Sequence, residues 1–144
     1  MDDDGAIRLR RVIGKIARQL NNSSTGAGLT PSQASVLGLI VARGPISLAE
    51  LASLEGLNPT MLSRVIGRLQ AMEMISRTPD PADLRSASVA STPAGQQVDQ
   101  EIKARRAAAV AKNLAQLTDA QVRALTEALP ALEALAEAMR EPQG

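Results

Sequence analysis

Apolar residues recur along most of this chain at the three- and four-residue spacing of an amphipathic α-helix. Between residues 6 and 22 they share one helix face, namely Leu9, Val12, Ile13, Ile16, Ala17 and Leu20. A second segment opens at Thr30, which can cap a helix whose first position is Pro31. This segment is nearly all apolar up to Gly44-Pro45, so we predict a central core helix there.

Two shorter helices follow, separated by a tight turn. Ser47-Leu-Ala-Glu50 is a capping-box sequence, and the helix that it opens is predicted to run to about Glu55. Gly56 suits the left-handed backbone conformation of the turn. Asn58-Pro59 then opens a helix that we predict to run to about Met74.

The remainder of the chain alternates between a predicted hairpin and two long helices. Short β-like stretches in residues 75–91 flank a polar tip at residues 80–86, and Thr92-Pro93 opens a helix to about Gln116. Thr118-Asp-Ala-Gln121 opens the last helix, and Pro130 is expected to kink it. Its apolar residues form a seam that needs another helix to cover it: Val122, Leu125, Leu129, Leu132, Ala136 and Met139. Only residues 1–5 and 141–144 are expected to be disordered tails.

The two short helices have the residue pattern of a helix-turn-helix. Such a pair needs a small residue where the helices cross and a turn residue with positive φ, and Ala52 and Gly56 meet those demands. Leu62 follows Ala52 by ten residues and can lock the second helix onto the first. A generic helical hairpin can show the same spacing, so the spacing alone leaves both readings open.

The second helix of the pair carries an unusual outer face. Its inward positions are Leu62, Val65, Ile66 and Leu69, which leaves Thr60, Ser63, Arg64, Gly67 and Arg68 outside. Hydroxyl groups and a helix N-terminus suit phosphate contacts, and arginine suits guanine edges or phosphates. An ordinary solvated face usually carries Glu and Lys, whereas no acidic residue lies between Glu55 and Glu73. The pattern therefore favours a DNA-binding helix.

Four charged residues cluster around the predicted hairpin tip: Arg77, Asp80, Asp83 and Arg85. Paired carboxylates could indicate catalysis or a metal site, but no His or Cys accompanies them. We favour a self-braced wing, in which the aspartates fix the turn and hold the local arginines. Arg85 would then be presented to the negative potential of a DNA minor groove.

Composition excludes several classes of function. The chain has no Cys and no His, so disulfides, thiol chemistry and the commonest general base and metal ligand are absent. It has no aromatic residue, which argues against single-strand binding by base stacking. No apolar run is long enough to span a membrane, and the first residues are acidic where a signal peptide is basic. We expect a cytoplasmic protein without enzymatic activity, cofactor or metal.

Charge is distributed unevenly, although the net charge is only +1. Residues 5–22 carry five basic side chains and no acid, whereas residues 118–141 carry five acids against two arginines. The C-terminal end is therefore expected to face away from a phosphate backbone. Ordinary solvated helix faces would explain the same distribution equally well.

Several motifs together resemble the MarR family of winged helix-turn-helix transcriptional regulators. Residues 29–37, with the sequence LTPSQASVL, resemble the opening of that family's second helix, and Leu48-Ala-Glu-Leu-Ala52 resembles its helix-turn-helix entry. Residues 59–64 (PTMLSR), 75–77 (ISR), 80–85 (DPADLR) and 92–95 (TPAG) resemble its recognition helix, its wing and the start of its long connecting helix. The likeness covers nearly the whole chain and implies a mainly α fold with a small β-hairpin wing.

The resemblance also implies partners and sites. It implies a homodimer on double-stranded DNA, in which residues 6–28 and 93–141 form the helical dimerisation region and residues 29–92 the winged helix-turn-helix. The operator would be a pseudo-palindrome with half-sites about 10 base pairs apart. DNA contacts are expected from Ser47, Asn58, Pro59, Thr60, Ser63, Arg64, Arg68, Arg77 and Arg85. Dimer contacts are expected from Val12, Leu125, Leu129, Leu132 and Met139.

Many relatives in this family are repressors that a small lipophilic or aromatic effector releases. Ile13, Ile16 and Leu37 are candidates for lining its pocket, although residues at such spacing are more often plain core. Because the chain has no aromatic residue to stack on a phenolic ligand, an aliphatic pocket fits it better.

The chain departs from the family pattern at three positions. Leu84 replaces a second wing arginine, and Gln70 and Glu73 replace the common Glu and Gly at the end of the recognition helix. A protein-interaction module that keeps the fold without binding DNA is therefore the alternative.

Overall fold

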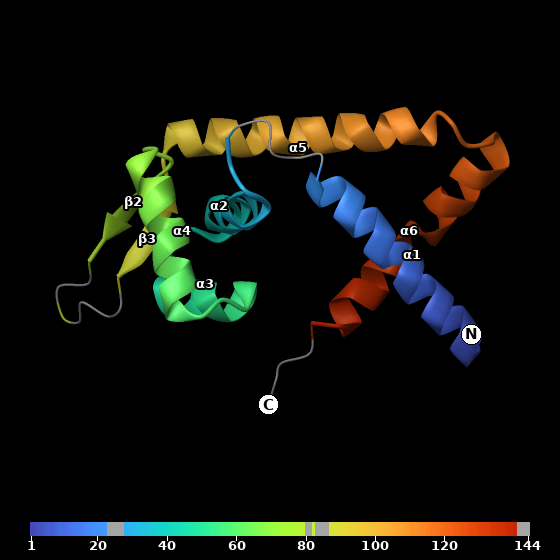
Figure 1. Ribbon diagram of the computed structural model, residues 1–144, viewed down its shortest axis with the longest axis horizontal. Helices are drawn as coiled ribbons and strands as arrows, with labels where there is room; N and C mark the ends of the chain where they lie inside the picture. The colour runs from blue at the N-terminus through green and yellow to red at the C-terminus, as the bar shows by residue number, and fades with distance from the viewer. Residues whose placement is uncertain (23–27, 80–81, 83–86, 141–144) are drawn as a thin grey trace. The chain divides into compact units, whose positions relative to one another are not determined.

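The computed structural model describes residues 1–22, 28–79, 82 and 87–140 (Figure 1). The chain forms two compact units, Met1–Ala107 and Ala108–Gly144. Its elements are, in order, α1 (Asp3–Asn22), α2 (Pro31–Arg43), β1 (Ile46–Ser47), α3 (Leu48–Glu55), α4 (Pro59–Ala71), β2 (Ile75–Thr78), β3 (Ser88–Ser91), α5 (Pro93–Leu114) and α6 (Asp119–Ala138). The predicted class, mainly α with a small β-hairpin, is confirmed. No helix in the described ranges combines the length and apolar character needed to cross a membrane.

The predicted helix caps form as local hydrogen bonds. Thr30 Oγ1 accepts from Gln33 N at 3.2 Å, and Gln33 Oε1 accepts from Thr30 N at 3.0 Å. Thr118 and Gln121 make the same reciprocal pair at the start of α6, at 3.1 and 3.0 Å. At Ser47 the hydroxyl half of the box is present, since Ser47 Oγ accepts from Glu50 N at 3.1 Å. Each cap satisfies helix N–H groups that would otherwise lack an intrahelical partner.

Helix α2 is the centre of the core in the first unit, as its apolar sequence predicted. Val36, Leu37 and Ile40 are fully buried. Helices α3 and α4, strand β3 and the first half of α5 pack around them, and Ile102 is the buried contact from α5. This core fixes the position of α4, which is the feature that matters for function.

The helix-turn-helix forms as the sequence indicated. Gly56 has φ 65°, the left-handed conformation in which a side chain is strained, and it ends α3. Leu57 N donates to Ala52 O at 3.1 Å, which closes the turn before Asn58 caps α4. Leu51 and Leu62 are buried between the two helices and α2.

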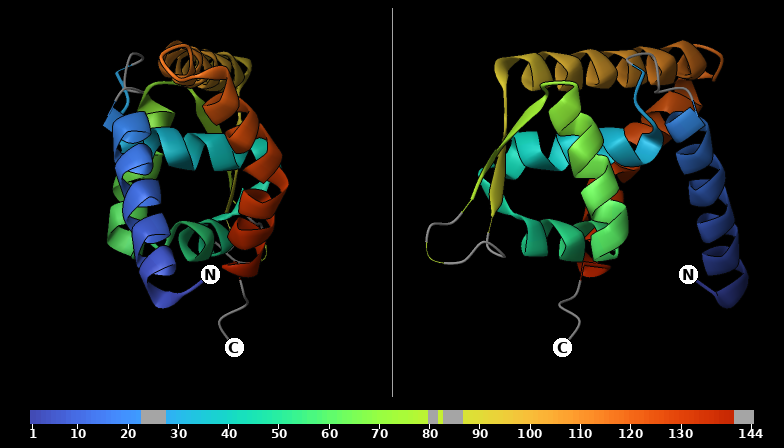
Figure 2. Two further views of the ribbon diagram at one scale, coloured as in Figure 1. Left: turned by 90° about the vertical axis from the view of Figure 1, so that its right-hand side faces the viewer. Right: turned by 60° about the vertical axis from the view of Figure 1, so that its left-hand side comes forward.

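The wing belongs to a three-stranded antiparallel sheet in the order β1-β3-β2. The views in Figure 2 show β2 and β3 running side by side next to α4. Arg77 on β2 pairs with Val89 on β3, as the predicted hairpin required. Strand β1 was not predicted, because its two residues have no period of their own. It exists through the pairing of Ile46 with the distant Val89.

The end of α4 differs from the prediction. The helix stops at Ala71 rather than near Met74, because Glu73 turns the chain with φ 60°. Met74 N then donates to Leu69 O at 3.0 Å, which closes the helix end. A left-handed residue cannot continue an α-helix, so the strand that follows starts in a new direction.

This helix end is bonded to the start of α5. Thr92 Oγ1 donates to Glu73 O at 2.7 Å and accepts from Gly95 N at 3.1 Å. Thr92 N donates to Met74 O at 3.0 Å. Gly95 packs so closely here that an added Cβ would collide with the Met74 carbonyl oxygen. The predicted cap at Thr92 therefore also ties α5 to α4.

The N-terminal tail was predicted wrongly. Helix α1 begins at Asp3, whereas residues 1–5 were expected to be a disordered tail. Asp2 caps the helix, because its Oδ1 accepts from Gly5 N at 2.8 Å and its carbonyl accepts from Ala6 N at 3.0 Å. Helix α6 continues through Pro130, and its kink stays a prediction. The expected C-terminal tail lies outside the described residues.

Candidate nucleic-acid interface

Helix α4 presents one buried and one open face. Leu62, Ile66 and Leu69 are at most 4% exposed and anchor the helix to α2 and α3. Thr60, Ser63, Arg64, Gly67 and Arg68 are all exposed. The predicted division of the helix into an inward and an outward face is therefore present. We call the five exposed residues the outer face of α4.

The N-terminus of α4 retains hydrogen-bond donors for a ligand. Asn58 Oδ1 accepts from Met61 N at 2.8 Å, so the cap uses the acceptor of the Asn58 amide and leaves its NH₂ group as a donor. The same holds for Ser47, the N-cap of α3, whose hydroxyl oxygen accepts from Glu50 N while its O–H can donate. Pro59 and Thr60 form the exposed first turn of α4. Anions favour such helix starts because unpaired N–H groups point outward.

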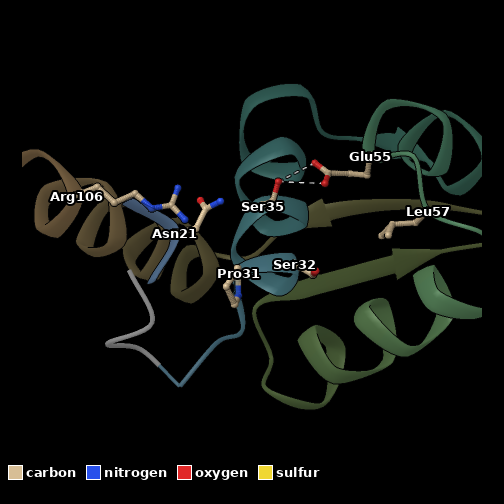
Figure 3. Close-up of a pocket in the computed structure, with 7 residues that line it drawn as sticks. All are labelled: Asn21, Pro31, Ser32, Ser35, Glu55, Leu57 and Arg106. Atoms are coloured by element: carbon tan, nitrogen blue, oxygen red, sulfur yellow. Dashed lines mark hydrogen bonds between the residues drawn. The ribbon is translucent and has the colours of Figure 1, made fainter. Parts of the chain in front are cut away.

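The two arginines of the outer face are not neutralised within the described residues. Neither the Arg64 nor the Arg68 guanidinium group has a hydrogen bond or an ion pair there. Glu55 on α3 is engaged elsewhere, because Ser35 Oγ on α2 donates to both of its carboxylate oxygens at 3.1 Å (Figure 3). Both guanidinium groups therefore remain able to bind phosphates or base edges.

The wing contributes one described candidate. Arg77 lies exposed on β2. Asp80, Asp83 and Arg85, which were predicted to brace and tip the wing, lie outside the described residues. The strands that support them are in place on either side of the tip, since Thr78 pairs with Ser88.

One hollow of about 280 Å³ lies in the first unit between α2, α3 and α5 (Figure 3). It is lined by Asn21, Pro31, Ser32, Ser35, Glu55, Leu57 and Arg106. None of the three predicted pocket residues belongs to it. Leu37 is sealed in the core, whereas Ile13 and Ile16 are 42% and 52% exposed on α1.

The residues predicted for dimerisation are poorly covered within this chain. Val12 on α1 is 45% exposed, and Leu125 and Leu129 on α6 are 44% and 50% exposed. Met139, the C-cap of α6, is 77% exposed. Leu132 is half-buried, and none of the residues of α6 is buried. In the described part of the chain, no group of acidic residues is placed to hold a metal ion.

One exposed residue of α4 was missed. Met61 is 50% exposed, although it belongs to neither of the two predicted faces. The signal was available, because Met61 precedes Arg64 by three residues and Arg68 by seven and so lies on their side of the helix. A large apolar side chain at such a position is not needed by the core.

The arrangement of these elements matches known regulators. A family model described as the MarR family matches residues 29–87, from the start of α2 to the wing. The transcriptional repressor MdtR of Bacillus subtilis (strain 168) is 27% identical over 119 residues, which cover 83% of this chain and 77% of that protein.

Solved structures agree over a larger part of the chain. The structure of RV1404 from Mycobacterium tuberculosis is 29% identical, with a TM-score of 0.74 and coverage of 98% of this chain and 93% of that one. A mutant of MepR from S. aureus, solved bound to an oligodeoxyribonucleotide, shares the fold at 14% identity, with a TM-score of 0.65 and coverage of 91% and 96%. Over residues 29–87 the chain matches the MarR family, and with these likenesses it is a winged helix-turn-helix DNA-binding transcriptional regulator.

Proposed function

We propose that this protein is a ligand-responsive repressor that binds a pseudo-palindromic operator as a homodimer. The observation that carries the proposal is the outer face of α4, where Arg64 and Arg68 stand exposed and free of ion pairs within the described residues. The oligodeoxyribonucleotide bound to the MepR mutant supports a DNA partner for this fold. Repression would follow from occlusion of a promoter by the bound dimer.

The proposed DNA contacts fall into three groups. Ser47, Asn58, Thr60 and Ser63, together with the helix start at Pro59, supply donors suited to phosphates and set the register of the helix. Arg64 and Arg68 supply the charged forks suited to guanine edges in the major groove. Arg77 and Arg85 are the wing residues proposed to contact DNA in or beside the minor groove, and Asp80 and Asp83 are proposed to brace the wing.

The experiment is binding to the DNA upstream of the protein's own gene over a series of salt concentrations. We expect site-selective binding whose log K falls steeply as log salt rises. Arg64→Ala or Arg68→Ala should weaken specific binding by about 1–3 kcal/mol where the side chain reads a base. Arg85→Ala should weaken binding to all duplexes by the same factor and should reduce the slope of log K against log salt by about one.

Arg123→Ala is the matched control, because it removes the same charge from α6, outside the helix-turn-helix. It should leave both the affinity and the slope nearly unchanged. An unchanged slope in Arg85→Ala would exclude the wing contact. Weak, sequence-independent or absent binding over the whole genome would favour a protein-interaction module, for which the net charge of +1 and Leu84 in the wing are the specific observations.

The dimer is proposed from the seam of α6 and from Val12 on α1. Leu125, Leu129 and Met139 expose apolar surface at the spacing of a helix-packing seam, and the apolar contact that would cover it has to come from another helix. A second copy of this chain is the proposed cover, since two half-sites need two recognition helices. Leu129→Glu should give a monomer in sedimentation and abolish tight operator binding, whereas Glu133→Gln, a change of charge four residues on, should do neither.

The effector has two candidate positions. Ile13 and Ile16 leave apolar surface open on α1, but Leu37 can meet a ligand only if the core opens. The polar hollow beside Ser35 and Glu55 is an alternative position. Release of the operator by a panel of lipophilic and aromatic compounds tests the response. Loss of release in Ile16→Ser, with unchanged release in Ser35→Ala, would locate it on α1.

A further inference from the structure

Met61 is an exposed apolar residue of α4 that does not belong to the hydrophobic core. The buried stripe of α4 is complete without it, because Leu62, Ile66 and Leu69 already fill the space against α2 and α3. Met61 itself is 50% exposed. About half of the Met61 surface stays in water, where it gains nothing from burial, so a partner outside the described chain would explain its presence better.

The backbone of Met61 is held in a fixed position. Met61 is the third residue of α4 and lies in its capped first turn. Its N–H donates to Asn58 Oδ1 at 2.8 Å. The side chains that follow on its side of the helix are Arg64 and Arg68. Met61 is therefore the apolar member of a row that is otherwise made of guanidinium groups.

The major groove offers little for an apolar side chain to contact. Base edges there present hydrogen-bond donors and acceptors, and the one apolar group among them is the 5-methyl group of thymine. The first turn of a recognition helix is the part that meets base edges. A thioether side chain is flexible and polarisable, so it adapts to a methyl group without a fixed geometry.

We propose that Met61 contacts the 5-methyl group of a thymine in each operator half-site and so determines specificity at that base pair. The inference rests on the proposed function, because it requires α4 to enter the major groove. It also predicts one feature of the operator sequence. Each half-site should contain a thymine close to the bases that Arg64 and Arg68 read, and its methyl group, rather than its hydrogen-bonding edge, should carry the preference.

The alternative is that Met61 contacts another protein rather than DNA. Leu54 on α3 is also exposed, at 43%, and two apolar residues on neighbouring helices could contact a protein partner. The position of Met61 beside two arginines favours DNA, because an apolar protein contact would bury these charges at considerable cost. The two occupants respond differently to the removal of a single methyl group from the DNA.

The test is a thymine-to-uracil scan of the footprinted operator, which removes one methyl group at a time and leaves every hydrogen-bonding group unchanged. Binding is measured by fluorescence anisotropy at fixed salt with the full-length protein. At one position in each half-site, uracil should weaken binding about fourfold, the equivalent of one buried methyl group. Met61→Gln, of similar length but polar, should bind thymine and uracil operators equally at that position. Met61→Leu should keep most of the discrimination.

Each outcome decides the proposal. A uracil penalty that disappears in Met61→Gln and persists in Met61→Leu supports it. A penalty of the same size in the wild type and in Met61→Gln assigns the thymine to another residue and overturns it. Salt-dependent operator binding without any uracil penalty also overturns it, while the proposed function stands. If no duplex is bound specifically, both fail together, and loss of a protein partner in Met61→Gln would then identify the competing occupant.

Discussion

Gly67 lies in the middle of α4, the proposed recognition helix, at a position where the fold does not require a glycine. A Cβ atom added there would meet nothing within 4 Å, and the backbone is ordinary helix. Glycine in a helix interior destabilises a protein by about 0.5–1 kcal/mol relative to alanine, because the unfolded chain has more freedom to lose. The intramolecular structure therefore predicts that Gly67→Ala is stabilising.

The same substitution is expected to weaken operator binding. Gly67 lies on the outer face of α4 between Arg64 and Arg68, so the added methyl group would project toward the DNA. If base edges or phosphates approach the helix backbone there, overpacking by one carbon costs about 1–3 kcal/mol in each half-site, roughly five- to 150-fold in affinity. A gain in stability together with a loss of binding is the expected signature of a residue kept for close approach.

Two measurements on one preparation test this expectation. Thermal unfolding at fixed protein concentration should show a rise of about 2–4 °C for the variant, and anisotropy with labelled operator should show weaker binding. Gly14→Ala makes the same change in α1, where the added Cβ would lie 3.8 Å from Arg18 Nη1, and it should raise stability without weakening DNA binding. Undiminished operator binding by a stabilised Gly67→Ala variant would refute the reasoning.

Two further predictions concern the junction between α4 and α5. Glu73→Gly should stabilise the protein by about 1 kcal/mol in chemical denaturation, because glycine adopts the φ of 60° without strain. Glu73→Ala removes the same charge but keeps the strain, so a gain of equal size there would assign the effect to charge. Gly95→Ala should destabilise by about 3 kcal/mol, since its Cβ would collide with the Met74 carbonyl. A near-wild-type unfolding midpoint for Gly95→Ala would show that α5 can shift away from the helix end.

Local chemistry explains why so much of this fold could be predicted from the sequence. Each helix start is marked by residues within one turn, and the caps at Thr30, Asn58 and Thr118 form as hydrogen bonds between neighbours. The apolar stripes place the inward faces of the helices for the same reason. The tail at residues 1–5 was predicted wrongly: Asp2 caps the helix there, but this cap precedes the apolar repeat from which the helix was predicted.

Nonlocal chemistry explains the rest. Strand β1 depends on a partner more than 40 residues away, and no period in its two residues could have revealed it. The early end of α4 depends on the positive φ of Glu73, and glutamate is not a residue type that favours this conformation. In the candidate site, the arginines were predicted because charge patterns are visible in a sequence. The spacing that places Met61 beside them is visible too, but an apolar residue type by itself does not indicate a DNA contact, and its exposure appears only in the structure.

The bonds from Thr92 to Glu73 and Met74 join α4, the proposed recognition helix, to the start of α5. Within the first unit α5 runs from Pro93 to Ala107, so this part of it forms a rod about 22 Å long with α4 bonded at one end. A tilt of about 10° around the other end of this rod would carry α4 through on the order of 4 Å, roughly the rise of one base pair. In the proposed dimer, such a tilt would change the half-site spacing that the protein accepts without any change in the residues proposed to touch DNA.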